Sequence, residues 1–232
     1  MRDGIYEVGG VSFNIREEKK GDIDIINEVF MDDVYRLREK SYTPEVIFDI
    51  GGHLGSFGVL AKTLWPNVRI IHVEPNNRSH ELAKKNLERF GNVEFVCGAM
   101  KYDRFANVFM DDDRATGGGS MLSIDDYNMN FAGTTYYIHT ENVTLYTIED
   151  LMEMFNVSKI DIVKLDCECG ERDFFNGLLP DTAEKIGDFT GEYHYERRDF
   201  IEDVKRVFPD YKLSFGGDYT HIGTFWGEKE SG

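Results

Sequence analysis

The chain has 232 residues, of which 41% are hydrophobic and 13% aromatic, a composition typical of one globular domain with a full core. Its 43 acidic residues against 26 basic ones give a net charge of −17, which argues against nucleic acid or an anionic membrane as a partner. No run approaches the roughly 18 apolar residues of a membrane span, and the N-terminus lacks the apolar core of a signal peptide. We therefore expect a soluble, cytoplasmic protein whose partner is a small molecule.

The first 44 residues predict an extension of a single domain that covers residues 1–232. Hydrophobic residues alternate weakly on both sides of Gly9 and Gly10, which predicts a small hairpin. Residues 22–38 then carry hydrophobic residues at helical spacing, so we expect a helix that caps the ligand-binding end of the sheet or covers its edge. Tyr35 in this helix either reaches a ligand or packs at the rim of the core.

Residues 46–64 predict a strand, a tight glycine loop and a helix, around which the rest of the chain is organised. Residues 46–50 are of strand type and run into Gly51, Gly52 and Gly55, and hydrophobic residues at helical spacing follow at once. In an open α/β sheet such a loop lies at the carboxyl edge of a strand, where ligands bind. Glycine allows positive φ and close approach of a ligand, and the helix N-terminus offers unpaired N–H groups.

Two carboxylates and a missing glycine indicate which ligand this loop binds. A dinucleotide loop requires Gly-x-Gly-x-x-Gly, and Ile50 occupies the first of these positions. Asp49 places a carboxylate at the mouth of the loop, where it would repel a pyrophosphate but suit the positive charges of S-adenosylmethionine. Glu74, at the end of the next predicted strand, is placed to accept both hydroxyls of a ribose, which NAD and S-adenosylmethionine share. The alternative is a structural glycine turn with a solvated Glu74.

Small residues follow the third predicted strand at residues 93–96. Gly98, Ala99 and Met100 leave room there for a flat ring such as adenine. A plain turn that binds nothing is an equal alternative.

Residues 101–146 predict an irregular insertion. They contain an acidic turn and a Gly-rich loop, and compact domains keep long irregular segments mostly as lids or specificity loops. We expect a lid over the site, with a flexible surface loop as the alternative.

Capping residues and alternation predict the remaining regular elements. Thr147 and Asp150 stand at the N-cap and third position of a helix, with Asp in place of the usual Glu. A helix at residues 198–208 follows later in the chain. Strands at residues 211–215 and 221–226, joined by a glycine turn, predict a closing antiparallel hairpin.

Asp166 and Glu168 follow a buried strand at residues 160–165, and their i, i+2 spacing predicts side chains on one face. Such a pair beside a cofactor cleft can raise each other's pKa to make a general base, or can bind a divalent cation. It can also pair with Lys164 and Arg172 as structure. The sequence leaves these three roles open.

Glu192 and His194 share one face of a predicted strand at residues 188–196. His194 is the leading candidate for a general base, because the unperturbed pKa of histidine lies near neutrality. The alternative is a histidine packed between strands as part of the structure.

Four segments resemble the FkbM family of S-adenosylmethionine-dependent methyltransferases: DIGGHLG at 49–55, VEPNN at 73–77, TIEDL at 147–151 and KLDCECGE at 164–171. The last two, in this order, point to this family in particular, and the later Glu192-x-His194 also matches it. The chain departs from the family at Gly52 and His53, where Ala and Asn are usual, and at Cys169, which shifts the glycine of the last motif by one place.

The resemblance implies a class I methyltransferase fold: an α/β, doubly wound, Rossmann-like sheet of seven mostly parallel strands with an antiparallel C-terminal hairpin. It also implies transfer of a methyl group from S-adenosylmethionine to a hydroxyl of a sugar, a polyketide or another small molecule. This reaction is an in-line displacement, so catalysis rests on positioning and on a base that takes the hydroxyl proton.

The residues and the resemblance together assign two sets of side chains and no metal ligand. The expected cofactor-binding residues are Asp49, Gly51, Gly52, His53, Gly55, Glu74, Pro75, Asn76, Gly98, Ala99, Met100 and Asp166. The expected catalytic residues are His194, Glu168, Asp166 and Glu192. Two alternatives remain: a variant in which Asp166 and Glu168 bind Mg²⁺ that polarises the hydroxyl, and a non-catalytic module that binds S-adenosylmethionine. A nicotinamide oxidoreductase is a less favoured third.

Overall fold

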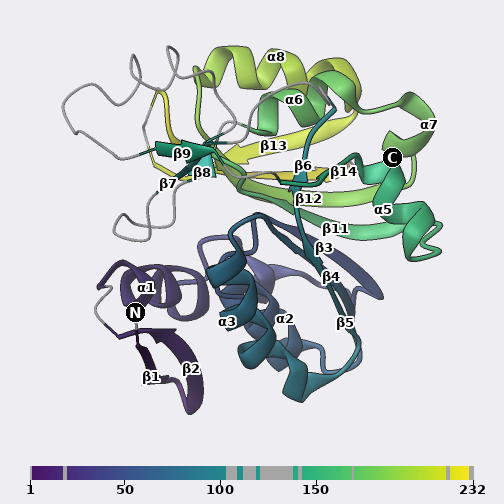
Figure 1. Ribbon diagram of the computed structural model, residues 1–232. Helices are drawn as coiled ribbons and strands as arrows, with labels where there is room; N and C mark the ends of the chain where they lie inside the picture. The colour runs from purple at the N-terminus through teal and green to yellow at the C-terminus, as the bar shows by residue number, and fades with distance from the viewer. Residues whose placement is uncertain are drawn as a thin grey trace.

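Seven strands form one mostly parallel sheet in the computed structural model, in the order β13-β14-β12-β11-β3-β4-β5 (Figure 1). The structure describes residues 2–17, 20–102, 109–111, 119–120, 138–140, 143–168, 170–217 and 220–229. The strands are β3 (Val46–Ile50), β4 (Arg69–Glu74), β5 (Val93–Cys97), β11 (Ile160–Leu165), β12 (Ile186–Tyr193), β13 (Tyr211–Phe215) and β14 (Gly223–Lys229). Only β14 runs against its neighbours within this sheet, which confirms the predicted fold class and its C-terminal hairpin.

Helices cover both faces of the sheet because each central strand alternates its hydrophobic side chains between two cores (Figure 1). In β3, for example, Ile47 packs toward α2 and α3, while Phe48 packs toward α5 and α6. The helices are α2 (Ser56–Leu64), α3 (Asn77–Leu87), the 3-10 turn η3 (Glu88–Phe90), α5 (Ile148–Met154), α6 (Gly170–Gly177), α7 (Pro180–Ala183) and α8 (Arg197–Val207). None of the helices in the described ranges is long and apolar enough to span a bilayer.

An aromatic cluster holds β12 between α6, α8 and β14. The ring of Phe175 in α6 lies 5.7 Å from Phe189 in β12, 5.5 Å from Phe200 in α8 and 6.5 Å from Phe225 in β14. Edge-to-face contacts of this kind add to the stabilisation that buried area alone supplies. The end of β12, where Glu192 lies, is therefore fixed from three sides.

The N-terminal extension contains the predicted hairpin but a shorter helix than predicted. Strands β1 (Asp3–Val8) and β2 (Val11–Arg16) pair around Gly9 and Gly10, both at positive φ. The α-helix α1 (Lys20–Ile26) continues as a π-helical turn, η1 (Asn27–Met31), and a 3-10 turn, η2 (Leu37–Glu39), follows.

The predicted helix at residues 22–38 is wrong beyond Met31 because of Asp33. This residue adopts a left-handed φ of 52°, which interrupts helical geometry. Its carboxylate then accepts the backbone N–H groups of Leu37 and Arg38 and starts a separate turn.

The described parts of the insertion at residues 101–146 contain short strands. Strand β6 (Ala99–Met100) pairs with β10 (Leu145–Tyr146), and β7 (Phe109–Asp111), β8 (Gly119–Ser120) and β9 (Ile138–Thr140) form a small antiparallel sheet. Most of the insertion lies outside the described residues, so its role as a lid stays a prediction.

The cap at the start of α5 has the predicted form. The hydroxyl of Thr147 accepts the N–H of Asp150 at 3.1 Å, and the carboxylate of Asp150 accepts the N–H of Thr147 at 2.8 Å. Asp therefore completes the capping box in place of the usual Glu.

Replacing the cap residue is expected to destabilise the fold. In Thr147→Ala one N–H of the first turn loses its partner, and the free energy of unfolding in urea falls by about 1 kcal/mol. Thr147→Ser keeps the hydroxyl and serves as the control, with stability close to wild type. Equal stability of the Ala and Ser variants would contradict a contribution from the cap.

Candidate active site

The glycine loop after β3 lies between the ends of β4 and β11. The N–H groups of Gly51 and Gly52 both donate to the carbonyl of Val73, at 2.9 and 3.0 Å. Gly51 has a φ of +70°, and a Cβ there would lie 1.8 Å from the carbonyl oxygen of Asp166. This position therefore requires glycine both for its conformation and for the close approach of the loop after β11.

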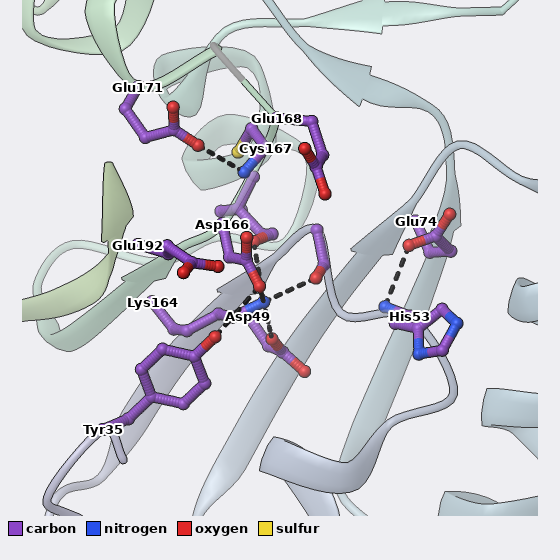
Figure 2. A network of polar contacts seen from close by, with 12 residues as sticks. Tyr35, Asp49, His53, Glu74, Lys164, Asp166, Cys167, Glu168, Glu171 and Glu192 are labelled. Atoms are coloured by element: carbon purple, nitrogen blue, oxygen red, sulfur yellow. Dashed lines mark hydrogen bonds and ion pairs between the residues drawn. The ribbon is translucent and has the colours of Figure 1, made fainter. Parts of the chain in front are cut away.

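Lys164 contacts this loop through its ammonium group (Figure 2). Its ammonium donates to the carbonyl of Gly51 at 2.5 Å and lies 3.7 Å from Asp49 and 3.5 Å from Asp166. Burial lowers the pKa of Lys164, but the carboxylates of Asp166 and Asp49 outweigh it and raise that pKa above its usual value. A charged lysine thus joins the glycine loop to the two carboxylates.

Asp49 lies under the loop rather than at its mouth. In the sheet register it stands between Lys164 of β11 and His72 of β4, and its side chain is fully buried. Its carboxylate lies 3.1 Å from Nδ1 of His72. The charge of Asp49 therefore faces Lys164, and a direct contact between Asp49 and a cationic ligand stays a prediction.

Glu74 connects the glycine loop to the turn after β4 (Figure 2). One carboxylate oxygen accepts the N–H of His53 at 2.9 Å, and the other accepts the N–H of Asn76 at 2.8 Å. Asn76 in turn caps α3 by accepting the N–H of Ser79, with Pro75 between the two acceptors. Burial raises the pKa of Glu74, although these N–H groups oppose the rise. Each carboxylate oxygen still has a lone pair for a ribose hydroxyl.

His53 adopts a left-handed φ of 49°, a conformation that Asn tolerates better than most residues. This is the position at which the FkbM pattern usually has Asn. The Nε2 atom of His53 lies 2.7 Å from the guanidinium of Arg16, which forms a buried pair with Asp22. Burial, together with Arg16, lowers the pKa of His53 to about 3. His53 is therefore neutral and ties the N-terminal hairpin to the loop.

Gly98 serves close packing in this structure. A Cβ on Gly98 would lie 2.6 Å from the ring of Tyr146 and 2.7 Å from the carbonyl of Thr144. Ala99 and Met100 are buried in the short strand β6. The space that we expected for an adenine ring beside Gly98 is thus filled by β10, and a role for these three residues in binding adenine stays a prediction.

Asp166, Glu168, Glu192 and His194 come together at the carboxyl ends of β11 and β12. The Nε2 atom of His194 lies 3.5 Å from Glu168, 3.6 Å from Glu192 and 3.9 Å from Asp166. The His194 side chain is 4% exposed, whereas the three carboxylates are 25 to 34% exposed. The cluster therefore has a buried imidazole below and carboxylates that reach solvent.

The turn after β11, not strand alternation, brings Glu168 to this cluster. The strand ends at Leu165, and Glu168 adopts a left-handed φ of 50°. Glu192 occupies the end of β12, and His194 follows directly after that strand. The sequence predicted the neighbours correctly, but Glu168 reaches the cluster through a left-handed turn and not through the i, i+2 alternation that we expected.

The charges of the cluster influence one another strongly. Burial raises the pKa of Glu168 to about 7, although the nearby His194 opposes the rise. Burial alone would lower the pKa of His194, but Glu168 and Glu171 outweigh it and raise that pKa well above the usual value. Burial likewise opposes ionisation of Asp166, yet Lys164 and His194 lower its pKa.

Sequence reasoning left one partner of the cluster undecided and missed another. Tyr35 donates its hydroxyl to Asp166 at 2.9 Å, a contact to a site residue that the sequence left undecided (Figure 2). Glu171 is fully buried, accepts the N–H of Cys167 at 2.5 Å and lies 3.4 Å from Nδ1 of His194. The signal for Glu171 was the last acidic residue of the KLDCECGE motif.

A cavity of about 850 Å³ adjoins the cluster through Glu192. Its wall comes from the N-terminal extension and from the C-terminal hairpin, with Arg36 lying 3.6 Å above the ring of Trp226. Charged side chains on the wall are Glu28, Asp32, Asp33, Arg36, Glu39 and Glu192. The charged groups of the wall are therefore predominantly acidic, on a lining that also contains Val34, Ile222 and Trp226.

The family model of the methyltransferase FkbM domain matches residues 49–211. The chain belongs to the FkbM methyltransferase family. A relative from Beauveria bassiana (strain ARSEF 2860), described as methyltransferase 1, is 25% identical over 221 residues, which cover 82% of this chain and 86% of the relative. The prediction of a methyltransferase that uses S-adenosylmethionine is confirmed at the level of the family.

Solved structures of methyltransferases share the fold of this FkbM domain. One, crystallised with S-adenosylhomocysteine, gives a TM-score of 0.53 at 11% identity and aligns 97% of this chain with 56% of its own. Another, described as a methyltransferase dependent on S-adenosylmethionine from Streptococcus mutans, gives a TM-score of 0.51 at 11% identity, with 97% and 55% covered. At this identity the likeness shows the fold alone.

The lowered pKa of His53 predicts a stability loss in acid. The folded protein holds His53 neutral down to about pH 3, whereas the unfolded chain takes up the proton near pH 6.5. Stability is therefore fully present above pH 6.5 and is lost as the pH falls below it. Between pH 7.5 and pH 5 the free energy of unfolding is expected to fall by on the order of 2 kcal/mol because of His53.

Urea unfolding of wild type and His53→Asn at both pH values measures this contribution. Asn suits the left-handed conformation and does not titrate, so the variant is expected to lose less stability in acid. His80, which also has a lowered pKa, remains in both proteins and cancels in the comparison. Parallel losses in the two proteins would show that His53 is not the titrating group.

Proposed function

We propose that this protein transfers the methyl group of S-adenosylmethionine to a hydroxyl oxygen of a small acceptor bound in the acidic cavity. The observation that carries the proposal is the position of Asp166. Its backbone packs against Gly51 of the cofactor loop, while its carboxylate faces His194 of the neighbouring cluster. The proposed cofactor site and the proposed acceptor site thus meet between β3 and β11. The strand order of the sheet reverses at this point, and ligands bind there in this type of fold.

On the cofactor side, Glu74 is proposed to accept the ribose hydroxyls. Its two oxygens are already oriented by the N–H groups of His53 and Asn76. The loop from Gly51 to Gly55 brings unpaired N–H groups of α2 to the same edge. Asp49 is proposed to act indirectly, by holding Lys164 against the carbonyl of Gly51.

On the acceptor side, the hydroxyl oxygen attacks the methyl carbon in line with the sulfur. The new O–CH₃ bond forms as the S–CH₃ bond breaks, and the electron pair of that bond stays on sulfur in S-adenosylhomocysteine. The hydroxyl proton passes to a carboxylate of the cluster, Glu168 or Glu192, which lie 3.5 and 3.6 Å from Nε2 of His194. Lys164 and Tyr35 fix Asp166 in this cluster.

The acidic cavity supports a neutral or cationic acceptor. Five carboxylates and one guanidinium line its wall, so an anionic acceptor would be repelled. The net charge of −17 adds to this repulsion for a polyanion such as nucleic acid. A polyhydroxylated molecule also suits this wall, because carboxylates accept hydrogen bonds from hydroxyl groups.

Calorimetric titration tests the cofactor half of the proposal. Wild type is expected to bind S-adenosylmethionine and S-adenosylhomocysteine but not NAD. In Glu74→Gln the ribose hydroxyls lose a charged acceptor, and binding weakens by roughly 1 to 3 kcal/mol. Glu81→Gln, an exposed carboxylate on α3, is the matched control with unchanged affinity. Binding of NAD instead would overturn the assignment of the cofactor site.

Production of S-adenosylhomocysteine with a panel of hydroxylated acceptors tests the acceptor half. His194→Ala removes the imidazole at the centre of the cluster, so turnover is expected to fall by at least about tenfold while affinity for S-adenosylmethionine stays unchanged. Turnover equal to wild type would remove His194 from the mechanism. Cofactor binding without turnover on the whole panel would favour a non-catalytic module.

A further inference from the structure

The cluster around His194 combines metal-ligating groups from two separate strand ends. Asp166 comes from the end of β11, and Glu192 and His194 come from the end of β12. One possible ligand atom from each of these three residues lies within 4.8 Å of the other two. Two carboxylates and an imidazole form a donor set that binds divalent cations in proteins.

The separations between these side chains leave room for an ion. A charge-assisted hydrogen bond has its heavy atoms about 2.7 to 2.9 Å apart, whereas Nε2 of His194 lies 3.6 Å from Glu192 and 3.9 Å from Asp166. Two ligands that are each about 2.1 Å from one ion lie roughly 3 to 4.2 Å apart. A single ion among these three atoms thus needs only small shifts of the side chains.

A buried carboxylate behind the imidazole is an independent indication of a metal ligand. Glu171 lies 3.4 Å from Nδ1 of His194, on the opposite side of the ring from Asp166 and Glu192. It is fully buried and held by the N–H of Cys167 at 2.5 Å. Metal-binding histidines usually donate their second ring nitrogen to such a carboxylate, which fixes the ring and directs the other nitrogen toward the metal.

We propose that Asp166, Glu192 and His194 bind one divalent cation, which holds and polarises the acceptor hydroxyl; this role rests on the proposed function. Oxygen ligands suit Mg²⁺ and Mn²⁺, and the imidazole favours Mn²⁺ of these two. Three protein ligands leave coordination positions for water or for acceptor oxygens. Because Glu192 also lines the cavity, the ion would lie at the edge of the cavity.

In this arrangement His194 is a ligand, and Glu168 is the group that takes the proton. The hydroxyl oxygen binds the cation, and its proton passes to the carboxylate of Glu168, which lies 3.5 Å from Nε2 of His194. The cation stabilises the negative charge that develops on the oxygen before it attacks the methyl carbon. The ligand set thus differs from the Asp166 and Glu168 pair that the sequence suggested.

Titration of the chelator-treated protein with Mn²⁺ tests the site without cofactor or acceptor. Binding is measured as the loss of the electron paramagnetic resonance signal of free Mn²⁺. Wild type is expected to bind one equivalent. Glu192→Gln and His194→Gln each remove a ligand and weaken binding by at least about tenfold. Glu81→Gln is the control, because Glu81 is an exposed carboxylate on α3.

Three outcomes would overturn the metal site. They are no Mn²⁺ bound by wild type at millimolar concentration, unchanged affinity in both ligand variants, or methyl transfer that chelator treatment leaves at full rate. Circular dichroism and binding of S-adenosylmethionine verify that the variants are folded, and Glu192→Gln tests the site if the buried His194 variant is not. Failure of Mn²⁺ binding with intact methyl transfer would reject the metal alone, whereas Mn²⁺ binding without transfer would reject the proposed function alone.

Discussion

The candidate site depends on the contacts of the buried ammonium of Lys164. It lies in the central strand β11, where the sheet reverses its order, and it faces carboxylates from two strands and a carbonyl from the cofactor loop. A buried charge is tolerated only with such partners, and the partners are in turn held by it. The loop after β3 and the turn after β11 therefore keep one relative position. Transfer of a methyl group beside these two segments, as we propose, needs this fixed geometry.

The sheet and its helices were predictable because their signals are local. Hydrophobic runs of strand length, glycine turns and the Thr147 cap each act over a few residues, and the structure contains all of them. The helix predicted through residue 38 failed for a local reason that periodicity does not show. Hydrophobic spacing continues past Met31, but the side chain of Asp33 competes for backbone N–H groups and ends the helical path.

The residues of the candidate site could be predicted from the sequence, but the directions of their side chains and their partners could not. Asp166, Glu168, Glu192 and His194 were found from strand ends and motif positions, and they are neighbours in the structure. The pairing of Asp49 with Lys164 could not be predicted, because Lys164 is distant in the sequence and the pairing depends on the sheet register. The sequence left the role of Tyr35 open and did not assign Glu171 to the site for the same reason: each acts on a residue that only the fold brings close.

The residues that line the cavity beside Glu192 lie mostly outside the part of the chain that matches the family model. The family match ends at residue 211 and begins at residue 49, whereas the cavity wall, apart from Glu192, comes from residues 28–39 and 216–226. The segments that would contact an acceptor therefore flank the region that this chain shares with its family. If the acceptor binds in this cavity, as we propose, exchange of these flanks between relatives would alter which molecule is recognised. Such an exchange would have to keep Tyr35, because its hydroxyl donates to Asp166 in the middle of the chain.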